Sequence, residues 1–429
     1  MLILRNGYVI DPETGFEGKR DLFIDNGRIS KICEPSVSVG RGFELVNGNT
    51  EIDCARYVIA PGLVDPHVHF RDPGFTYKED IITGAAAAAK GGYSSVIMMG
   101  NTNPHMDTPD TISYVLDKGR RTAIHVYACG NITRDMQGKD LTDMQALKAA
   151  GAVLFTDDGV PILDESLMKR ACNKAAELNM IISLHEENPA FIKQNGINEG
   201  EVSKSLGLDG SNRQAEISMV ERDIRIAMET GAEITIQHIS AAESVELIRE
   251  ARKKTDKIHA EVTPQHFTLT DEALVSKGAL ARVNPPIRTK QDREALIQGL
   301  IDGTIDMIAT DHAPHSVEEK SRDITSAPSG MIGLETALSL GIRELVCKNR
   351  LTLKELLYKM STAPASVYGL DAGFIKEGGV ADLCIFDPKE EWICSSFVSK
   401  ASNSPFIGEK MVGAVHYTIA GGKLAYRRF

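Results

Sequence analysis

The spacing of hydrophobic residues divides the chain into a central region and two similar ends. At both ends, short apolar segments are separated by turn-forming pairs such as Asn26-Gly27 and Gly421-Gly422, which is typical of β-hairpins. In the centre, β-branched runs alternate with stretches whose apolar residues recur every three or four positions. We therefore predict a central domain over residues 57–368. Residues 1–56 and 369–429 have too few strands to close a core alone, so we predict that they pair into one small β-sandwich.

The central region repeats a strand-then-helix pattern eight times. Strands are predicted at residues 58–68, 95–99, 124–127, 152–155, 181–184, 233–236, 258–262 and 305–309, with helices between them, as at 110–121, 140–150, 165–179, 215–231, 243–255 and 291–303. This alternation favours the α/β class and a TIM-like (β/α)8 barrel, whose active site lies at the carboxyl ends of the strands. A doubly wound open sheet is the alternative, but no Gly-x-Gly-x-x-Gly or Gly-Lys-Ser loop follows the first strand.

Composition narrows the classes of function. The 429 residues are 42% hydrophobic and 25% charged, as in an ordinary globular protein, and the formal net charge is −11. An acidic chain with only short basic runs argues against binding nucleic acid or a membrane surface. The seven cysteines form no Cys-x-x-Cys pair, and no uncharged apolar run approaches the roughly 18 residues of a membrane span. We expect a soluble, cytoplasmic protein that acts on a small molecule.

Polar residues collect where the predicted strands end. Seven of the eleven histidines lie there with three aspartates, as His67, His69, Asp157, Asp158, His185, His238, His266, Asp311, His312 and His315. Because a barrel brings the carboxyl ends of its strands together, we expect one shared site. His67 and His69 are two apart on a strand and face the same side, and Arg71 is expected on that face too. For that histidine pair alone, ordinary surface residues are the alternative.

Imidazoles and carboxylates without thiolates suit Zn²⁺ or a similar divalent ion. Two histidines from the first strand, one each from the fifth and sixth, and carboxylates after the fourth and eighth make six candidate ligands. That number exceeds the needs of one tetrahedral ion, so one or two ions are expected, with a carboxylate bridging a pair. Such a centre activates water and polarises a carbonyl group, which predicts a hydrolase.

Two longer motifs carry a resemblance to a known family. Residues 67–74 are His-Val-His-Phe-Arg-Asp-Pro-Gly, and residues 309–315 are Ala-Thr-Asp-His-Ala-Pro-His. With Asn-Thr-Asn-Pro at 101–104, Phe-Thr-Asp-Asp-Gly at 155–159, Val-Asn-Pro-Pro at 283–286 and Gly-Leu-Glu-Thr at 333–336, they resemble the signatures of dihydroorotases in the amidohydrolase superfamily. The resemblance implies reversible interconversion of N-carbamoyl-L-aspartate and L-dihydroorotate in de novo pyrimidine (UMP) biosynthesis.

The same resemblance implies which residues bind the metal. The ligands would be His67, His69, Asp158, His185, His238 and Asp311. Asp158 takes the bridging position, as in the bacterial type that uses an aspartate in place of a carboxylated lysine, and residues 155–159 contain no lysine. Asp311 is also expected to act as general base and acid, and a carboxylate that only holds metal is the alternative.

The expected substrate carries a carboxylate that neutral hydantoins lack. Arg71 can bind such a group through its planar guanidinium, although an ion pair with Asp72 is the alternative. The resemblance adds Asn101 and His315 to this carboxylate clamp. It also assigns Asn284 and the backbone near Ser329 and Gly330 to the ring amides.

Three positions depart from the family pattern, namely Gly100, Gln265 and Ser329. They put the strictness of substrate choice in question. A hydantoinase-like or allantoinase-like cyclic amidase is one alternative function, and a catalytically silent homologue that scaffolds a partner enzyme is another. We expect a homodimer, with aspartate transcarbamoylase as a candidate partner. Residues 134–139 and 318–328 are polar and flank strand ends, so either could close over the substrate.

Overall fold

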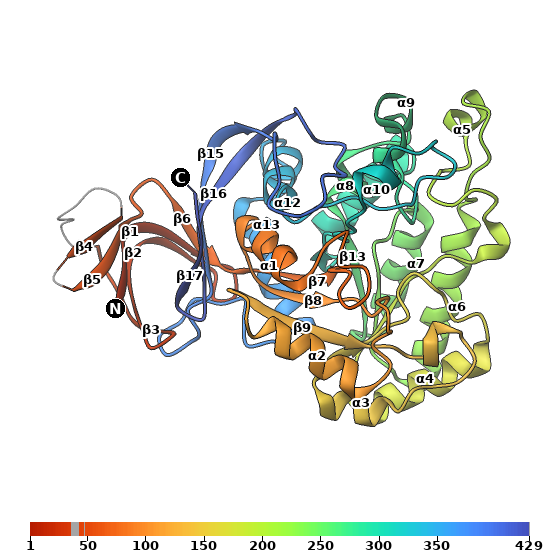
Figure 1. Cartoon of the computed structure of the whole chain (residues 1–429), viewed down its shortest axis with the longest axis horizontal. Helices are drawn as coiled ribbons and strands as arrows, with labels where there is room; N and C mark the ends of the chain where they lie inside the picture. The colour runs from red at the N-terminus through yellow and green to blue at the C-terminus, as the bar shows by residue number, and fades with distance from the viewer. Residues whose placement is uncertain (36–42, 47, 429) are drawn as a thin grey trace.

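The chain folds into a barrel and a smaller β domain that lie next to each other (Figure 1). The computed structural model describes residues 1–35, 43–46 and 48–428. Within these residues, all strands belong to two sheets, one of nine strands and one of eight. Strands from both ends of the chain enter the nine-stranded sheet, which confirms a small β domain built from the two termini. The N-terminal segment predicted over residues 1–56 includes residues 36–42 and 47, which lie outside the described residues.

The eight-stranded sheet is the predicted parallel barrel. Its strands, in spatial and chain order, are β7 (Leu63–Val68), β8 (Tyr93–Met98), β9 (His125–Gly130), β10 (Ala152–Phe155), β11 (Ile182–Leu184), β12 (Ile234–Ile236), β13 (Ile258–Val262) and β14 (Met307–Ile308). A parallel bridge between Val68 and His312 brings the chain after β14 next to β7, so the ring is nearly closed. The doubly wound alternative is wrong, because the strand order never reverses.

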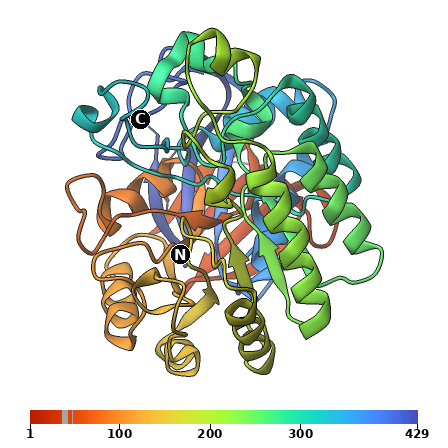
Figure 2. The same ribbon diagram turned by 90° about the vertical axis from the view of Figure 1, so that its right-hand side faces the viewer.

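Helices surround the barrel strands (Figure 2). The α-helices are α1 (Ile81–Lys90), α2 (Pro109–Gly119), α3 (Met144–Ala150), α4 (Glu165–Glu177), α5 (Glu201–Ser205), α6 (Gln214–Thr230), α7 (Ala242–Arg252), α8 (Pro264–Thr268), α9 (Ala273–Lys277), α10 (Lys290–Asp302), α11 (Val317–Lys320), α12 (Ala337–Gly341), α13 (Leu353–Leu357) and α14 (Ala363–Val367). Short 3-10 or π segments are η1 (Arg134–Met136), η2 (Pro189–Phe191), η3 (Gly278–Ala281), η4 (Ile342–Val346) and η5 (Tyr358–Thr362). Among the described residues, no helix is both long enough and apolar enough to cross a bilayer.

All six predicted helices are present, as α2, α3, α4, α6, α7 and α10. The pattern does not predict α1, because alanines fill half of it and give little contrast between apolar and polar positions. Local chemistry starts this helix instead. The Asp80 side chain accepts hydrogen bonds from the backbone N–H groups of Ile82 and Thr83, and so satisfies donors that the first turn leaves free.

The nine-stranded sheet joins the two ends of the chain. Its strands are β1 (Leu2–Asp11), β2 (Phe16–Asp25), β3 (Arg28–Cys33), β4 (Phe43–Val46), β5 (Asn49–Asp53), β6 (Val58–Pro61), β15 (Leu383–Ile393), β16 (Lys410–Ala420) and β17 (Lys423–Arg427). One edge of β1 pairs with β5 along its first half and with β6 along its second half, so the sheet divides there. Antiparallel pairing of β6 with β15 then joins the C-terminal strands to the N-terminal ones. Leu22, Ile59, Leu383 and Ile419 share one buried core.

The first predicted barrel strand is in fact two strands. The apolar run predicts a single strand over residues 58–68, but the structure divides it at Gly62 into β6, in the small sheet, and β7, in the barrel. A Cβ atom at Gly62 would lie 2.2 Å from the Ser94 hydroxyl, so the chain passes β8 too closely for a side chain. Both strands are fully buried, which makes the apolar run continuous across the break. The domain boundaries near residues 57 and 368 stay a proposal.

Candidate active site

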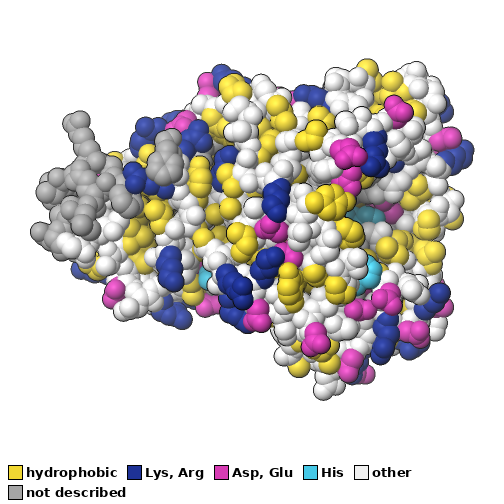
Figure 3. All heavy atoms as spheres, in the orientation of Figure 1, with side chains coloured by type: hydrophobic (Ala, Val, Ile, Leu, Met, Phe, Trp, Pro, Cys, Tyr) yellow, Lys and Arg dark blue, Asp and Glu magenta, His cyan; other side chains and the backbone are white. Residues whose placement is uncertain are grey.

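A cavity of about 200 Å³ opens at the carboxyl ends of the barrel strands. It is lined by His69, Arg71, Asn101, Asp158, Gly159, His185, His238, Asn284, Asp311, Ala313, His315, Ser329 and Gly330. Of the predicted site residues, only His67 is not included in this lining, and it lies beneath the surface at 1% exposure. Histidine side chains are visible in the barrel half of the space-filling view (Figure 3). A larger hollow of about 510 Å³, between β9 and the β16–β17 turn, contains none of the predicted residues.

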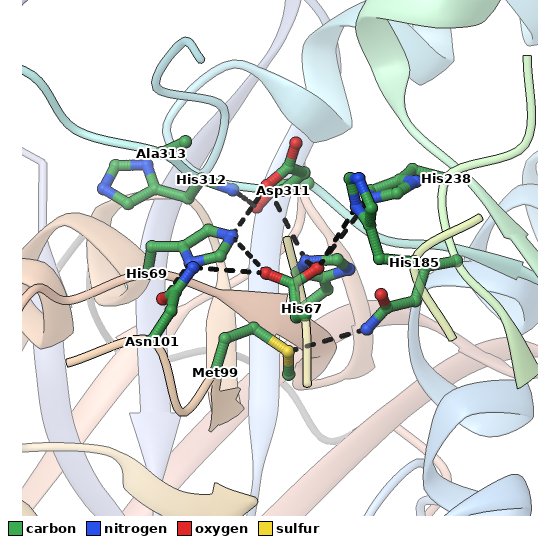
Figure 4. A network of polar contacts seen from close by, with 12 residues as sticks. His67, His69, Met99, Asn101, His185, His238, Asp311, His312 and Ala313 are labelled. Carbon is green, nitrogen blue, oxygen red and sulfur yellow. Dashed lines mark hydrogen bonds and ion pairs between the residues drawn. The ribbon is translucent and has the colours of Figure 1, made fainter. Parts of the chain in front are cut away.

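The two histidines of the first barrel strand face two carboxylates (Figure 4). The Nε2 atom of His69 lies 3.0 Å from Asp311 Oδ1 and 3.4 Å from Asp158 Oδ2. The Nε2 atom of His67 lies 3.4 Å from Asp158 Oδ1 and 3.7 Å from Asp311 Oδ1. Both rings therefore direct one nitrogen into the same small space.

Two more histidines approach from β11 and β12. The Nδ1 atom of His185 lies 3.0 Å from His238 Nε2 and 3.6 Å from Asp158 Oδ1. The Nε2 atom of His238 lies 3.9 Å from that same carboxylate oxygen. Asp158 therefore turns Oδ2 toward His69 and Oδ1 toward the other three rings. Asp158 thus lies between His69 on one side and the other three rings on the other.

Five of the six side chains form groups that could hold a cation, and the sixth, His185, adjoins them through His238. Two sets of ligand atoms each lie within 4.8 Å of one another, namely those of His67, Asp158 and His238 and those of His67, His69 and Asp311. Among the described residues, neither His67 Nε2 nor Asp158 Oδ1 has a hydrogen-bond partner, although both are buried. Buried polar atoms are rarely left without partners, so these atoms are suited to hold an ion. Imidazole and carboxylate donors without thiolates match Zn²⁺.

Burial and neighbouring charges shift the pKa values of the cluster in different directions. Burial opposes ionisation of Asp158, but the neighbouring imidazoles of His67 and His185 hold its pKa well below the usual range. Burial, reinforced by the positive charges of His185 and His67, lowers the pKa of His238. Burial works against protonation of His185, yet Asp158 and Glu187 raise its pKa to about 10. These shifts favour an anionic Asp158 and a neutral His238.

Three of the four rings have a partner on the side away from the cluster. Nδ1 of His67 lies 2.6 Å from Glu261 Oε1, and Nε2 of His185 lies 3.2 Å from Glu187 Oε2. In each case the outer nitrogen donates its proton to the carboxylate, which leaves the inner lone pair free for a metal. Sequence reasoning did not single out either glutamate. Two features of the sequence could have identified them. Glu261 is the one acidic residue in a buried strand, and Glu187 follows His185 by two residues, so both side chains can face the same side.

Asn101 contacts the ligand cluster as well as the cavity. Its Oδ1 lies 3.0 Å from His69 Nδ1, and its Nδ2 donates to Asp158 Oδ2 at 3.4 Å. The amide thus fixes the orientation of one ring and one carboxylate. The preceding Gly100, a departure from the family pattern, has a local reason: a Cβ atom there would lie 2.7 Å from Asn131 Nδ2.

Arg71 lines the cavity from a loop and not from a strand. The sequence predicts it on the face of the first strand, but β7 ends at Val68, and Arg71 has a φ of +60°. Its Nε donates to the Pro314 carbonyl at 3.3 Å, and burial lowers its pKa. The alternative pairing with Asp72 is wrong, because Asp72 is bound 2.6 Å from the ammonium of Lys118.

Three other polar residues at strand ends hold loops. Asp157 accepts hydrogen bonds from backbone N–H groups of the loop that follows β9. Nε2 of His266 lies 2.9 Å from the Pro285 carbonyl, and Nδ1 of His312 accepts from the Gly333 N–H at 3.2 Å. None of the three has a ligand atom in the two groups that could hold a metal. Their hydrogen bonds to loop backbone show that these side chains anchor loops.

Apart from Arg71, the wall opposite the ligands consists of neutral groups and backbone. Burial, reinforced by Arg71 and Lys78, lowers the pKa of His315 to about 3, so its ring is neutral. Nε2 of His315 lies 2.8 Å from the Ser329 carbonyl and must therefore carry the proton. The side-chain oxygen of Asn284 is buried and has no hydrogen-bond partner among the described residues. That oxygen lines the cavity ready to accept a proton donor from a ligand.

Sequence comparisons with known proteins point to one family. A family model described as Dihydro-orotase-like matches residues 56–244. The chain is 50% identical to a dihydroorotase of Clostridioides difficile (strain 630) over 99% of this chain and 100% of that protein. It is 48% identical to a dihydroorotase of Clostridium acetobutylicum and 47% identical to one of Lactococcus lactis, each over 99% of both chains.

Solved structures share the whole architecture. The chain is similar to an L-hydantoinase (dihydropyrimidinase) from Arthrobacter aurescens, with a TM-score of 0.87 and 24% identity over 99% of this chain and 96% of that one. It is also similar to a dihydropyrimidinase from Brevibacillus agri NCHU1002, with a TM-score of 0.83 and 23% identity over 99% and 95% of the two chains. At such low identity the likeness shows the fold alone, a barrel with an attached β domain.

Proposed function

The chain belongs to the dihydroorotase family, and from that premise we propose that it is a zinc-dependent dihydroorotase. It is then an enzyme that hydrolyses a cyclic amide. The proposed reaction is the reversible interconversion of N-carbamoyl-L-aspartate and L-dihydroorotate in de novo pyrimidine biosynthesis. The proposal also includes a cytoplasmic location, a homodimer and aspartate transcarbamoylase as a candidate partner. For the homodimer and the partner, the support is the family resemblance.

One observation supports the choice of an acidic substrate more than any other. Arg71 lines the cavity as a half-buried side chain beside the ligand cluster, and no described carboxylate lies within 4.0 Å of its guanidinium. Asp311, Asp158 and Glu319 act on this guanidinium only from a longer distance, so a carboxylate supplied by a ligand would be its first close acidic partner. The carboxylate of dihydroorotate would be such a partner, whereas a neutral hydantoin would provide none.

Six residues would hold the metal in this proposal, namely His67, His69, Asp158, His185, His238 and Asp311, with Asp158 between two ions if two bind. When bound, Zn²⁺ supplies a Lewis acid that polarises the scissile carbonyl and makes a water molecule more acidic. Glu261 and Glu187 hold the rings of His67 and His185 in the tautomer that leaves the inner nitrogen free.

Asp311 is the proposed general base and acid. Its carboxylate lines the cavity and lies within 3.0 Å of His69 Nε2, so it can accept a proton from the attacking water. The new C–O bond forms as the ring C–N bond breaks, and Asp311 returns the proton to the departing nitrogen. In the reverse direction the same carboxyl group takes the proton from the nitrogen that closes the ring. Proton transfer and metal ligation by one carboxylate are compatible.

The other wall would orient the substrate. Arg71 receives the substrate carboxylate, with Asn101 and His315 beside it. Asn284 Oδ1 accepts a ring N–H, and the backbone near Ser329 and Gly330 contacts the ring amides. His315 already donates its ring proton to the Ser329 carbonyl. To contact the substrate carboxylate, the same N–H would have to donate to both acceptors or leave the Ser329 carbonyl.

Metal analysis combined with an assay in both directions tests the proposal. The purified enzyme should contain one or two zinc ions per chain, open dihydroorotate and close N-carbamoyl-aspartate. An Arg71→Met variant should lose most of its affinity for dihydroorotate while its zinc content is unchanged. A zinc-replete enzyme that opens hydantoin but not dihydroorotate would contradict the proposal, and full zinc occupancy without turnover of either would favour a silent homologue.

A further inference from the structure

A buried lysine supports the wall that faces the metal ligands. Lys320, the last residue of α11, is only 6% exposed. Its ammonium donates hydrogen bonds to the carbonyls of Pro328 at 2.9 Å and Gly330 at 3.0 Å. Among the residues that the structure describes, no carboxylate lies within 4.0 Å of this ammonium. Buried lysines usually pair with an acid, so a lysine held by carbonyls alone requires a reason.

The contacts of Lys320 fix a short stretch of backbone. The carbonyls of Pro328 and Gly330 accept from Lys320, and the Ser329 carbonyl between them lies 2.8 Å from His315 Nε2. The Gly330 carbonyl also accepts from the Asn403 amide at 3.1 Å. Because three consecutive carbonyls have fixed donors, the peptide planes between them are fixed too. The portion of the cavity wall formed by Ser329 and Gly330 therefore has one defined orientation.

The same stretch leaves little room to adjust. Gly330 has a φ of +128°, a conformation that favours glycine. A Cβ atom at this position would lie 2.9 Å from the Ala313 Cβ and 3.0 Å from His315 Nε2. Lys320 thus holds a tightly packed backbone in place and not a free loop.

A second buried cation has the same kind of partners. Arg282, 5% exposed, donates to the carbonyls of Asn195 at 2.9 Å and Ile324 at 2.7 Å, and also to that of Ala327. Again, no carboxylate of the described residues lies within 4.0 Å of it. Away from solvent, charges without a counter-ion act over longer distances than they would in water. Arg282 keeps its charge, whereas burial and the nearby Arg282 lower the pKa of Lys320 to about 7, so Lys320 is only partly charged near neutral pH.

We propose that Lys320 is a positioning residue: its hydrogen bonds fix the backbone from Pro328 to Gly330 against the substrate ring. Lys320 does not touch the substrate. This role rests on the proposed function, because it requires a substrate whose ring meets Ser329 and Gly330. It predicts an effect on substrate binding that the metal ligands do not share.

Lys359 provides a matched control for the test. It is also buried, at 7% exposure, and its ammonium donates to a carbonyl, that of Ile305 at 2.7 Å. Ile305 precedes β14, so this contact lies at the end of the barrel opposite the cavity. Lys359→Met and Lys320→Met thus remove the same kind of interaction in two places, one behind the substrate wall and one far from it.

The experiment measures kcat and KM for ring opening of dihydroorotate, zinc content and Tm for both variants and the unmodified enzyme. Lys320→Met should raise KM about tenfold, the equivalent of one charge-assisted hydrogen bond. Its kcat should change less than about threefold. The wall that Lys320 fixes contacts the bound substrate and the transition state alike, so both lose the same binding energy. Zinc content should stay the same. Lys359→Met should lower Tm but leave KM unchanged.

Two outcomes would overturn the inference while leaving the proposed function intact. One is a KM for Lys320→Met within twofold of the KM of the unmodified enzyme, when the unmodified enzyme does open dihydroorotate. The other is an equal rise in KM for Lys320→Met and Lys359→Met, which would indicate a general loss of packing. If Lys320→Met does not fold, Lys320→Gln, which keeps a donor but no charge, is measured in its place. Failure of the unmodified enzyme to open dihydroorotate would instead contradict the proposed function itself.

Discussion

The two walls of the cavity are built in different ways. The metal-ligand wall, formed by the six proposed ligands, consists of side chains at or just beyond the ends of β7, β10, β11, β12 and β14. The substrate wall, formed by Arg71, Asn284, His315, Ser329 and Gly330, consists of loop residues. Neighbouring strands hold the first wall, whereas hydrogen bonds between distant loops hold the second. A barrel can therefore keep its chemistry while its substrate wall changes.

The supports behind the two walls have opposite charge. Behind the metal-ligand wall, the carboxylates of Glu261 and Glu187 contact ring nitrogens of His67 and His185. Behind the substrate wall, the Arg282 cation and the partly charged Lys320 contact backbone carbonyls. Negative support suits residues that hold a cation, and positive support suits residues that hold an anion. The charge of each support thus indicates the charge of what its wall binds.

The largest expected effect comes from changing the acid-base group of the metal-ligand wall. Asp311→Asn keeps the shape of the side chain but removes its ability to carry a proton. We expect kcat to fall by about 10²- to 10⁴-fold, the usual contribution of a general acid or base. Steady-state kinetics gives the change in kcat, and zinc analysis shows whether the metal is retained.

Ser329→Ala is the comparison from the substrate wall. It removes only the hydrogen bond to Asn195 at 2.8 Å, so the loss in kcat/KM should stay below about tenfold.

If kcat of Asp311→Asn stayed within tenfold of the original value with zinc retained, Asp311 would be a ligand only. That result would restore the alternative in which another group moves the proton. If zinc were lost instead, the measurement would report on ligation, and proton transfer would have to be tested with zinc in excess.

The metal-ligand wall was largely predictable from the sequence. Each ligand adjoins a β-branched run, and parallel strands bring their carboxyl ends to one place, so local patterns give global positions. The strand count and the place of His185 and His238 follow from that rule alone. The pattern could not show that β7 begins only after Gly62, because close packing against Ser94 leaves no trace in the hydrophobic period.

The substrate wall and both sets of supports were much less predictable. Glu261 lies 194 residues from His67, and Asn403 lies 73 residues from Gly330, so no local pattern connects the partners. Arg71 was expected on a strand, but the strand ends three residues earlier and a left-handed residue turns the chain. Loop conformation depends on such long-range contacts, which a single sequence does not display.

A change in support should have a smaller effect than a change in the wall itself. Glu261→Gln keeps an acceptor for the proton on His67 Nδ1 but removes the negative charge beside it. We expect zinc to bind about 10- to 100-fold more weakly, the usual effect of altering a residue behind a metal ligand. Competition with a chelator gives the zinc affinity directly and does not require turnover.

Glu233→Gln is a matched control for this measurement. Glu233 also contacts a histidine, with its Oε1 2.9 Å from His259 Nε2, but His259 belongs to neither group of candidate metal ligands. Its zinc affinity should equal that of the unmodified enzyme. Equal affinities for Glu261→Gln and the unmodified enzyme would show that the carboxylate near His67 does not support the metal-ligand wall.

The smallest expected effect lies at the opposite end of the barrel, away from both walls. His125, at the start of β9, pairs with Asp382 at 3.1 Å, and this hydrogen bond raises the pKa of His125 despite burial. A histidine whose pKa is raised by folding adds stability below its unfolded pKa, about 6.5, and loses that contribution as pH rises through the folded value. Because the side chain is 37% exposed, solvent screening should keep the contribution below about 1 kcal/mol. His125→Gln should therefore be less stable than the unmodified enzyme near pH 6 and nearly equal to it at pH 9 in chemical unfolding, with KM and zinc affinity unchanged.

A stability difference that grew with pH would contradict the ion pair, and a change in KM would show that the barrel transmits changes from this end to the walls.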